Sequence, residues 1–238
     1  MLFWQSMQYD HIEATSEDDF VTKSVAVLKE RITQSLDEFG SAIIGLSGGS
    51  TPKAIYTALG KEDLDWSNVF IFLVDDRYID ASDSDSNQKL VHETLLTNAS
   101  IPDENIIFPD TSLPLEECIK TYEVNLAELL SKGIPHTVTL GLAEDGHIAS
   151  LFPPVPPAGY GDHLVIHTET DAFAVHDRIT TTMVVIGSAD RKIFFLKGDQ
   201  KKFVWDEMMQ SEDSEDMDRW PAKAALQLGG GVVVSLFA

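Results

Sequence analysis

Short apolar runs of strand length alternate along this chain with longer segments whose apolar residues recur at helical spacing. Such alternation favours parallel strands joined by helical crossovers. It predicts an α/β fold, an open and mostly parallel Rossmann-like sheet with helices covering both faces. The expected strands span 41–46, 69–74, 136–142, 192–196 and 231–237; the expected helices span 52–59, about 86–96, 115–130 and 200–209, with one more after the capping pair Ser16 and Asp19. In the helix at 86–96 we expect Leu90, His92 and Leu95 to lie inward or half-inward.

The length and composition suit a single domain covering residues 1–238. The chain is 43% apolar and 24% charged, and neither a repeat nor a linker rich in proline, glycine or serine divides it. Its apolar runs are all shorter than a membrane span, so we expect a soluble, cytoplasmic protein without a membrane partner. Cys118 falls on the apolar face of the helix at 115–130, which predicts a buried thiol.

The charge balance argues against nucleic acid as a partner. The chain has 17 Lys and Arg against 39 Asp and Glu, and the resulting net charge of −22 repels a polyanion at long range. The acidic run 212–218 is expected to be a solvated loop, because nothing spaces its carboxylates around a metal ion. If the ligand is a small anion, the few cations must be concentrated where it binds.

Polar residues gather where the expected strands end. The segments are Ser47–Thr51, Asp75–Arg77, Asp145–His147 and Lys197–Lys201. In open parallel sheets, ligands bind outside the carboxyl ends of the strands. These segments therefore predict one binding site along that edge of the sheet.

The segment Ser47–Thr51 has the features of an anion-binding loop. Its glycines let the backbone approach an oxyanion, Thr51 can cap the following helix, and Pro52 suits the first helical position. A phosphate would fit there. The loop lacks the lysine of a nucleotide P-loop and the spacing of a dinucleotide-binding turn, so neither class of nucleotide is supported.

Residues 45–49 also match the nucleophile-elbow pattern of serine hydrolases, with Asp75 and His147 downstream in the right order. However, Ser47 follows the first expected strand, whereas an α/β-hydrolase builds several strands before its nucleophile. We therefore interpret Ser47 as a turn residue or a backbone contact to a ligand.

His147 is the imidazole best placed for chemistry. Asp145, two residues away, can orient the ring or stabilise its charge, so that His147 serves as a general base near neutral pH. An Asp-x-His pair can also bind a metal ion, but no other His or Cys has matching spacing. We expect neither a metal nor another cofactor.

Several segments together resemble 6-phosphogluconolactonases in order and spacing. They are 46–52 (LSGGSTP), Asp75–Arg77 with Ser86–Asn87, 141–153 (GLAEDGHIASLFP), Arg178–Thr180 and Gly198–Lys201. The resemblance implies the fold shared with glucosamine-6-phosphate deaminases and ribose-5-phosphate isomerases. It also implies metal-free hydrolysis of 6-phosphogluconolactone in the oxidative pentose phosphate pathway. The expected partner is thus a small phosphosugar lactone, bound by a monomer or a small homo-oligomer.

The resemblance also implies roles for individual residues. His147 would take a proton from the attacking water, Asp145 would orient the imidazole, and Asp75 would line the sugar site. The phosphate would be held by Gly48, Gly49, Ser50 and Thr51, with positive charge from Arg178 and Lys201 and with Arg77 and Asn87 at the site rim. The chain departs from the family pattern in having Asp76 in place of a Glu, no proline before Arg178, and no acid in 229–238.

Two alternatives stay open beside the lactonase. Deaminases of this fold carry a Glu at the position of Phe152, where it completes a ring-opening relay, so Phe152 favours a lactonase. A sugar-phosphate-binding regulatory module would keep the glycine loop and lose the base. The presence of both Asp145 and His147 therefore favours an enzyme.

Overall fold

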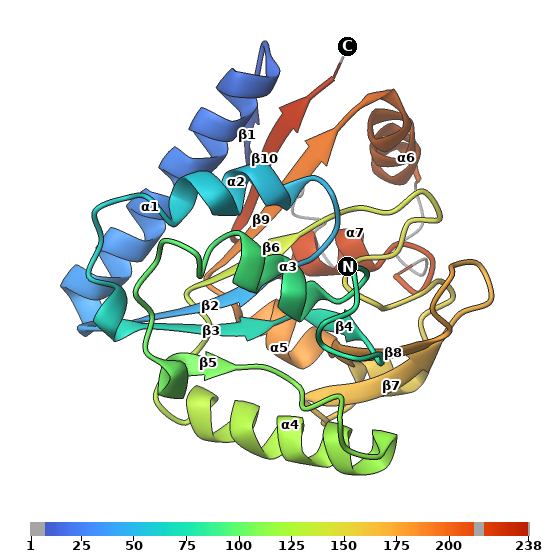
Figure 1. The fold of residues 1–238 in the computed structure, drawn as a ribbon. Coiled ribbons are helices and arrows are strands. Elements are labelled where there is room, and N and C mark those ends of the chain that lie inside the picture. Colours follow the sequence, from blue (N-terminus) through green and yellow to red (C-terminus); the bar gives the residue numbers. More distant parts are fainter. Residues whose placement is uncertain (1–7, 212–216, 238) are drawn as a thin grey trace, which may run out of the picture.

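The computed structural model describes residues 8–211 and 217–237, and within them the main feature is a seven-stranded sheet (Figure 1). The strand order is β1-β10-β9-β6-β2-β3-β5, and every neighbouring pair is parallel. The strands span Tyr9–Glu13 (β1), Ala42–Leu46 (β2), Val69–Leu73 (β3), Ile106–Ile107 (β5), Thr137–Leu140 (β6), Arg191–Lys197 (β9) and Gly231–Leu236 (β10). Most of the acidic run predicted to be a solvated loop, residues 212–216, lies outside the described residues.

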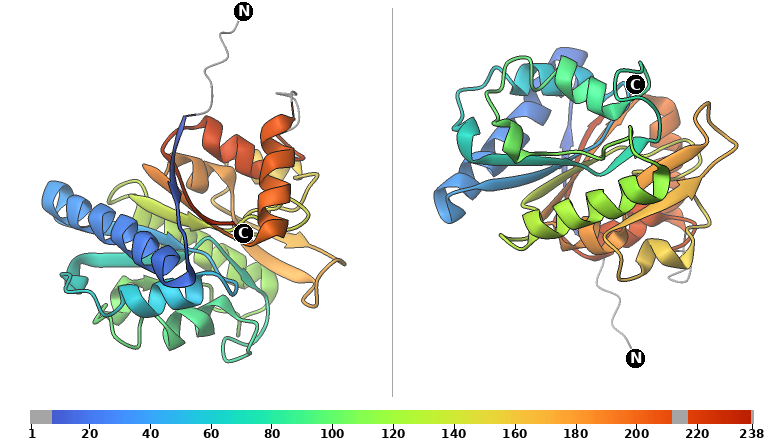
Figure 2. Two further views of the ribbon diagram at one scale, coloured as in Figure 1. Left: turned by 90° about the horizontal axis from the view of Figure 1, so that it is seen from above. Right: turned by 60° about the horizontal axis from the view of Figure 1, so that its bottom comes forward.

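Helices cover both faces of this sheet (Figure 2). One face carries α1 (Glu17–Phe39), α2 (Pro52–Leu59) and α3 (Asn87–Glu93); the other carries α4 (Leu115–Leu130), α5 (Met183–Ser188), α6 (Asp199–Gln210) and α7 (Pro221–Gln227). Because successive strand residues point to opposite faces, Ile44 packs with the first group of helices and Ile43 with the second. The predicted α/β fold class is confirmed. The described chain also contains the short 3₁₀ turns Trp66–Asn68, Asp103–Asn105 and Pro157–Tyr160.

A second, antiparallel sheet is formed by β4 (Asp75–Arg77), β8 (Asp177–Thr181) and β7 (Val165–Glu169), in that order. The expected strand 69–74 is thus followed directly by a second strand, because Asp75–Arg77 pair with residues 178–180. Three consecutive polar residues show no strand alternation, and only the pairing with a distant segment makes them extended. This sheet brings residues about a hundred positions apart to the same edge of the molecule.

Helix α3 is shorter than predicted at its carboxyl end. It starts after Ser86, whose hydroxyl accepts two backbone N–H groups of the first turn. It ends before Thr94, whose hydroxyl donates a 2.6 Å hydrogen bond to the carbonyl of Leu90. Leu90 and Leu95 are buried as expected, but His92 is exposed, so its predicted inward position is wrong.

Other local predictions are confirmed. The N–H of Asp19 donates to the hydroxyl of Ser16 at 3.1 Å and so caps α1. The Cys118 thiol on α4 is free and fully buried. None of the helices in the described ranges is long and apolar enough to span a membrane.

Candidate active site

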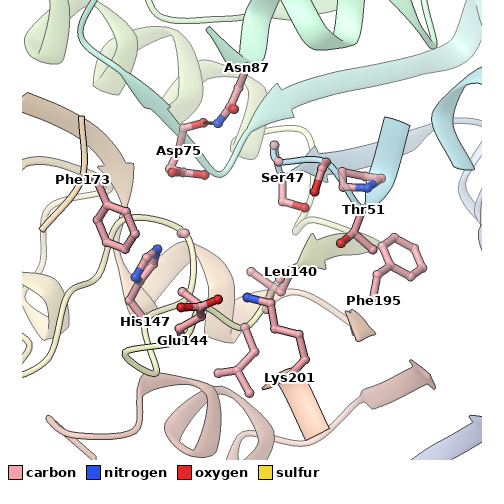
Figure 3. Close-up of a pocket in the computed structure, with 18 of the residues that line it drawn as sticks. Ser47, Thr51, Asp75, Asn87, Leu140, Glu144, His147, Phe173, Phe195 and Lys201 are labelled. Atoms are coloured by element: carbon pink, nitrogen blue, oxygen red, sulfur yellow. Dashed lines mark hydrogen bonds between the residues drawn. The ribbon is translucent and has the colours of Figure 1, made fainter. Parts of the chain in front are cut away.

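The carboxyl ends of β2, β6 and β9, together with β4, surround a pocket of about 420 Å³ (Figure 3). It is lined by the predicted residues Gly48, Gly49, Ser50, Thr51, Asp75, Arg77, Asn87, His147, Arg178 and Lys201, and also by Ser47, Pro52, Leu140, Gly141, Leu142, Ala143, Glu144, Ala149, Phe173 and Phe195. Of the predicted site residues, all of which are described, only Asp145 lies outside this lining. The polar segments predicted to share one site therefore do meet.

The glycine loop between β2 and α2 has a backbone that requires its glycines. Gly49 has a φ of +94°, in the left-handed region that side chains other than hydrogen rarely adopt. At Gly48 an added Cβ would lie only 1.7 Å from Oδ1 of Asn87. Thr51 stands at the N-cap position and Pro52 opens α2 as predicted, but the Thr51 hydroxyl makes no capping hydrogen bond. That hydroxyl therefore faces the pocket without a helix partner.

Asp75, Arg77 and Asn87 form one hydrogen-bonded wall of the pocket. Asn87 Nδ2 donates to the carbonyl of Asp75 at 2.8 Å, and Arg77 Nη1 donates to Asn87 Oδ1 at 2.5 Å. Asp75 is 8% exposed, and its carboxylate accepts a 2.6 Å hydrogen bond from the hydroxyl of Ser150. Ser150 belongs to the same segment as His147, so this bond ties β4 to the Asp-Gly-His turn.

Asp76 lies behind this wall and has a structural role. Its buried carboxylate accepts the backbone N–H groups of Arg77, Asn87 and Gln88 at 2.8, 2.7 and 3.2 Å, which fixes the start of α3 against β4. Burial raises the pKa of Asp76 to about 6. Because Asp76 does not line the pocket, the departure from the family pattern at this position concerns the scaffold, not the pocket surface.

His147 and Asp145 form a close pair. His147 Nδ1 lies 2.6 Å from Asp145 Oδ1, and the backbone N–H of His147 donates to the same oxygen at 3.1 Å. Burial disfavours the Asp145 carboxylate, but the hydrogen bonds and the charge of His147 outweigh it, and the pKa of Asp145 is lowered. The imidazole also packs on Phe152 and Phe173, with ring centroids 4.6 and 5.3 Å away. The ring is thus held through Nδ1 and its two aromatic neighbours, while His147 still lines the pocket.

The turn that carries this pair is held from behind by residues that the sequence did not single out. Gly146 has a φ of +91°, and a Cβ there would lie 2.6 Å from Nη1 of Arg219 and 2.8 Å from the ring of Trp220. Arg219 Nη1 donates to the carbonyl of Asp145 at 2.7 Å and its guanidinium stacks 3.8 Å above Trp220. Only the fold brings residues 219 and 220 to this turn, so no local pattern could have shown their role.

Besides Arg77, two more cations reach the pocket, each from a different element. Arg178, on β8, is 6% exposed; its Nε donates to the carbonyl of Val175 at 2.9 Å, and no carboxylate of the described chain lies within 4 Å of its guanidinium. Burial and the charge of Arg77 lower the pKa of Arg178. Lys201, on α6, points its amine into the pocket (Figure 3), and burial lowers its pKa. A buried guanidinium that lacks a carboxylate partner favours an anionic ligand.

Ser47 is oriented by neighbours other than His147. Its backbone N–H donates to Thr139 Oγ1 at 2.9 Å, its hydroxyl lies 3.3 Å from the same atom, and its carbonyl accepts from the hydroxyl of Tyr56. Ser47 is 5% exposed. This geometry agrees with a turn residue and lacks the serine–histidine contact of a hydrolase triad.

Some pocket residues were missed by the sequence reasoning. Glu144 lies within the recognised motif, but its exposed carboxylate has no spacing signal of its own. Phe173 comes from the loop between β7 and β8, where nothing in the linear sequence marks a site residue. Ala149 has a φ of +50°, a left-handed backbone conformation that residues other than glycine rarely adopt.

Comparisons with known proteins agree with this geometry. The family model described as glucosamine-6-phosphate isomerases/6-phosphogluconolactonase matches residues 15–234. A Dictyostelium discoideum protein named "Probable 6-phosphogluconolactonase" is 44% identical over 218 residues, which cover 90% of this chain and 92% of that protein. The solved 6-phosphogluconolactonase of Plasmodium vivax superposes with a TM-score of 0.90 at 25% identity, covering 98% of this chain and 92% of that one. One from Shewanella baltica superposes with a TM-score of 0.82 at 27% identity, covering 97% and 98%. As its sequence motifs predicted, the chain belongs to the glucosamine-6-phosphate isomerase/6-phosphogluconolactonase family.

Proposed function

We propose that this protein is an enzyme that hydrolyses 6-phospho-D-glucono-1,5-lactone to 6-phosphogluconate. The observation that carries the proposal is the His147–Asp145 pair, with its 2.6 Å contact, at the pocket that Arg178 and Lys201 also enter. A base and an anion-binding group at one site are what a phosphorylated lactone requires. The relatives and solved structures named above support the same substrate.

The phosphate would bind at the glycine loop. There the backbone N–H groups at the start of α2 and the hydroxyls of Ser50 and Thr51 can donate to its oxygens. Arg178 and Lys201 supply the positive charge. In a chain of net charge −22, Arg178, Lys201 and Arg77 concentrate positive charge at this pocket, beside the carboxylates Asp75 and Glu144.

His147 would act as the general base. With Nδ1 held by Asp145, the other ring nitrogen is available to accept a proton from a water that attacks the lactone carbonyl. The carbonyl oxygen becomes an oxyanion and then reforms the double bond as the ring C–O bond breaks. The leaving ring oxygen takes the proton back from the imidazolium, and the new acid ionises at neutral pH. Asp145 stabilises the imidazolium throughout.

Phe152 supports a lactonase over a deaminase. Its ring packs 4.6 Å from the His147 ring, at the position where the deaminase relay places a carboxylate. An apolar ring cannot pass a proton to an amino sugar. The same packing shields one side of the imidazole from water.

We further propose that the reaction serves the oxidative pentose phosphate pathway in the cytoplasm and proceeds without a metal ion in the pocket. The fully buried, free Cys118 is compatible with a reducing compartment.

A direct assay tests the proposal. The purified protein should accelerate the loss of freshly made 6-phosphogluconolactone above its spontaneous hydrolysis, and His147→Ala should remove most of that acceleration. His92→Ala, which changes an exposed imidazole on α3, is the matched control and should behave as the unmodified protein. Ammonia release from glucosamine 6-phosphate would instead identify a deaminase. Binding of both sugars without turnover would identify a regulatory module.

A further inference from the structure

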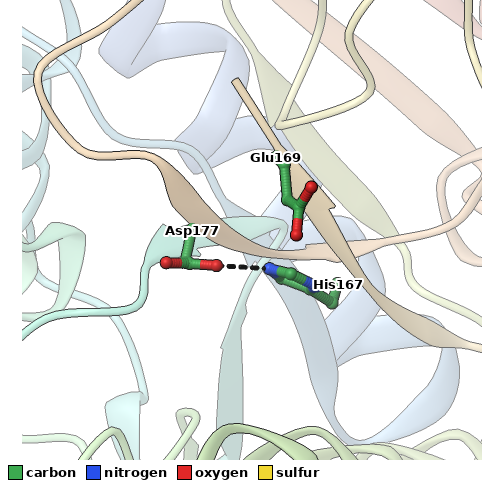
Figure 4. A group of neighbouring side chains, drawn as sticks. All are labelled: His167, Glu169 and Asp177. Atoms are coloured by element: carbon green, nitrogen blue, oxygen red, sulfur yellow. Dashed lines mark hydrogen bonds and ion pairs between the residues drawn. The ribbon is translucent and has the colours of Figure 1, made fainter. Parts of the chain in front are cut away.

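Three side chains of metal-binding type meet on the β7–β8 hairpin, outside the pocket described above (Figure 4). His167 and Glu169 come from β7 and Asp177 from β8. One ligand atom of each lies within 4.8 Å of the others. His167 Nε2 and Asp177 Oδ1 are 2.8 Å apart.

The strand geometry explains why these side chains converge. Residues two apart on a strand project from the same face, so His167 and Glu169 are neighbours along β7. Glu169 is paired directly with Asp177 across the antiparallel ladder. The two hydrogen-bonded strands therefore hold the three side chains around one point, where an ion could contact all three. The remaining coordination positions are open to water or to a fourth side chain.

The charges of this group call for a cation. Two carboxylates that face each other across a ladder repel one another. Among the described residues, the groups in ion-pair contact with Asp177 are the imidazoles of His167 and His176, the latter with Nδ1 at 3.6 Å. No Lys or Arg of the described chain pairs with Glu169 or Asp177. Asp177 thus has imidazoles, which also ligate metals, as its partners, and the nearby Glu169 adds a second negative charge.

The three side chains also have room beside them for an ion and are accessible from solvent. His167 and Glu169 line a cavity of about 360 Å³ that is bounded on its other side by Phe152 and the prolines that follow it. The side chains of His167 and Asp177 are 26% and 42% exposed. An ion can therefore reach the group from solvent and keep bound waters on the cavity side.

We propose that His167, Glu169 and Asp177 bind a divalent transition-metal ion of the zinc class. Imidazole together with carboxylates favours zinc, cobalt or nickel over magnesium and calcium, which prefer oxygen ligands alone. The site is separate from the proposed lactone chemistry. Its expected effect is to brace the hairpin whose loop carries Phe173 and whose second strand carries Arg178.

Metal binding to the intact protein tests this proposal without any activity measurement. After treatment with a chelator and desalting, titration with ZnCl₂ followed by calorimetry should show one bound zinc per chain. Thermal unfolding should shift to higher temperature with ZnCl₂ and not with MgCl₂. His167→Asn and Asp177→Asn should each weaken zinc binding by more than about tenfold, the lower bound for losing even a supporting contact of a metal site.

Two control variants locate the ion. His147→Asn removes the pocket imidazole and His92→Asn an exposed one, and both should bind zinc as the unmodified protein does. Zinc-edge absorption of the unmodified protein should show imidazole in the coordination shell, which keeps the test valid if a hairpin variant fails to fold. The proposal is overturned if no zinc binds, if the coordination shell lacks imidazole, if binding survives both hairpin variants, or if it is lost in His147→Asn.

Discussion

Replacing Gly48 by Ala tests how tightly the glycine loop is seated against the pocket wall. The new Cβ would lie 1.7 Å from Oδ1 and 2.1 Å from Cγ of Asn87, whereas real Cβ contacts essentially never fall below 3.0 Å. Asn87 cannot yield easily: it is 1% exposed and held by hydrogen bonds to Asp75 and Arg77. The loop must therefore move by at least about 1.3 Å, the difference between the two distances.

A displacement of that size has a large expected effect on catalysis. Misplacing a bound substrate by about 1 Å can cost roughly 100-fold in rate. We therefore expect kcat/KM for 6-phosphogluconolactone to fall by about 100-fold in Gly48→Ala, equivalent to about 2.7 kcal/mol at 25 °C. The protein should remain folded, because the loop lies at the open edge of the sheet.

Steady-state lactone hydrolysis, corrected for the spontaneous reaction, measures this effect. Gly133→Ala is the matched control, because an added Cβ there meets nothing within 4 Å. Asn87→Gly in the same chain as Gly48→Ala removes the colliding side chain, so the double variant should lose less than the sum of the single losses. A folded Gly48→Ala protein with kcat/KM within threefold of the unmodified enzyme would refute the reasoning, as would fully additive losses.

Three further predictions follow from the site. Asp145→Asn removes the carboxylate that holds His147, so kcat should fall by about 100-fold or more. Substrate binding, measured by titration, should change little. An unchanged kcat would contradict the role assigned to Asp145. Arg178→Met should raise KM more than it lowers kcat, and urea unfolding should show a loss of no more than about 1 kcal/mol, because a buried charge without a carboxylate partner is removed. The pKa of Asp76 is raised to about 6 from 3.8, so between these pH values the folded state binds more protons than the unfolded state. Asp76 therefore lowers the stability as pH rises from about 4 to 6, by up to about 1.4 kcal/mol per pH unit. Asp76→Asn removes this contribution, so stability measured by urea unfolding should fall less, or rise more, from about pH 4 to 6 than in the unmodified protein. An unchanged slope would assign the effect to other groups.

The parts of the fold set by local patterns were predictable from the sequence. Runs such as residues 42–46 and 69–73 are fully or almost fully apolar, as strands buried on both faces must be. The polar segments that follow them could be assigned to one edge because parallel strands end on the same side. The glycine loop and the His147 turn were found in this way, and both line the pocket.

The parts set by contacts between distant residues were not predictable. Asp75–Arg77 form a strand only because residues 178–180 pair with them. Phe173 enters the pocket from a hairpin loop, and Arg219 braces the Asp145 turn from 74 residues away. The misplacement of His92 has a different cause. His92 lies inside α3, two residues after the buried Leu90, and residues two apart on a helix point about 200° apart, so His92 faces solvent.

The pairing of β1 with β10 has a consequence for biosynthesis. β10 lies between β9 and β1, and it is the strand that joins β1 to the sheet. The two strands are also linked by a hydrogen bond between His11 and Ser235, 224 residues apart. During translation, β1 therefore has no place in the sheet until residues 231–236 have left the ribosome. The sheet is completed late, and β1 depends on being kept from other partners until then.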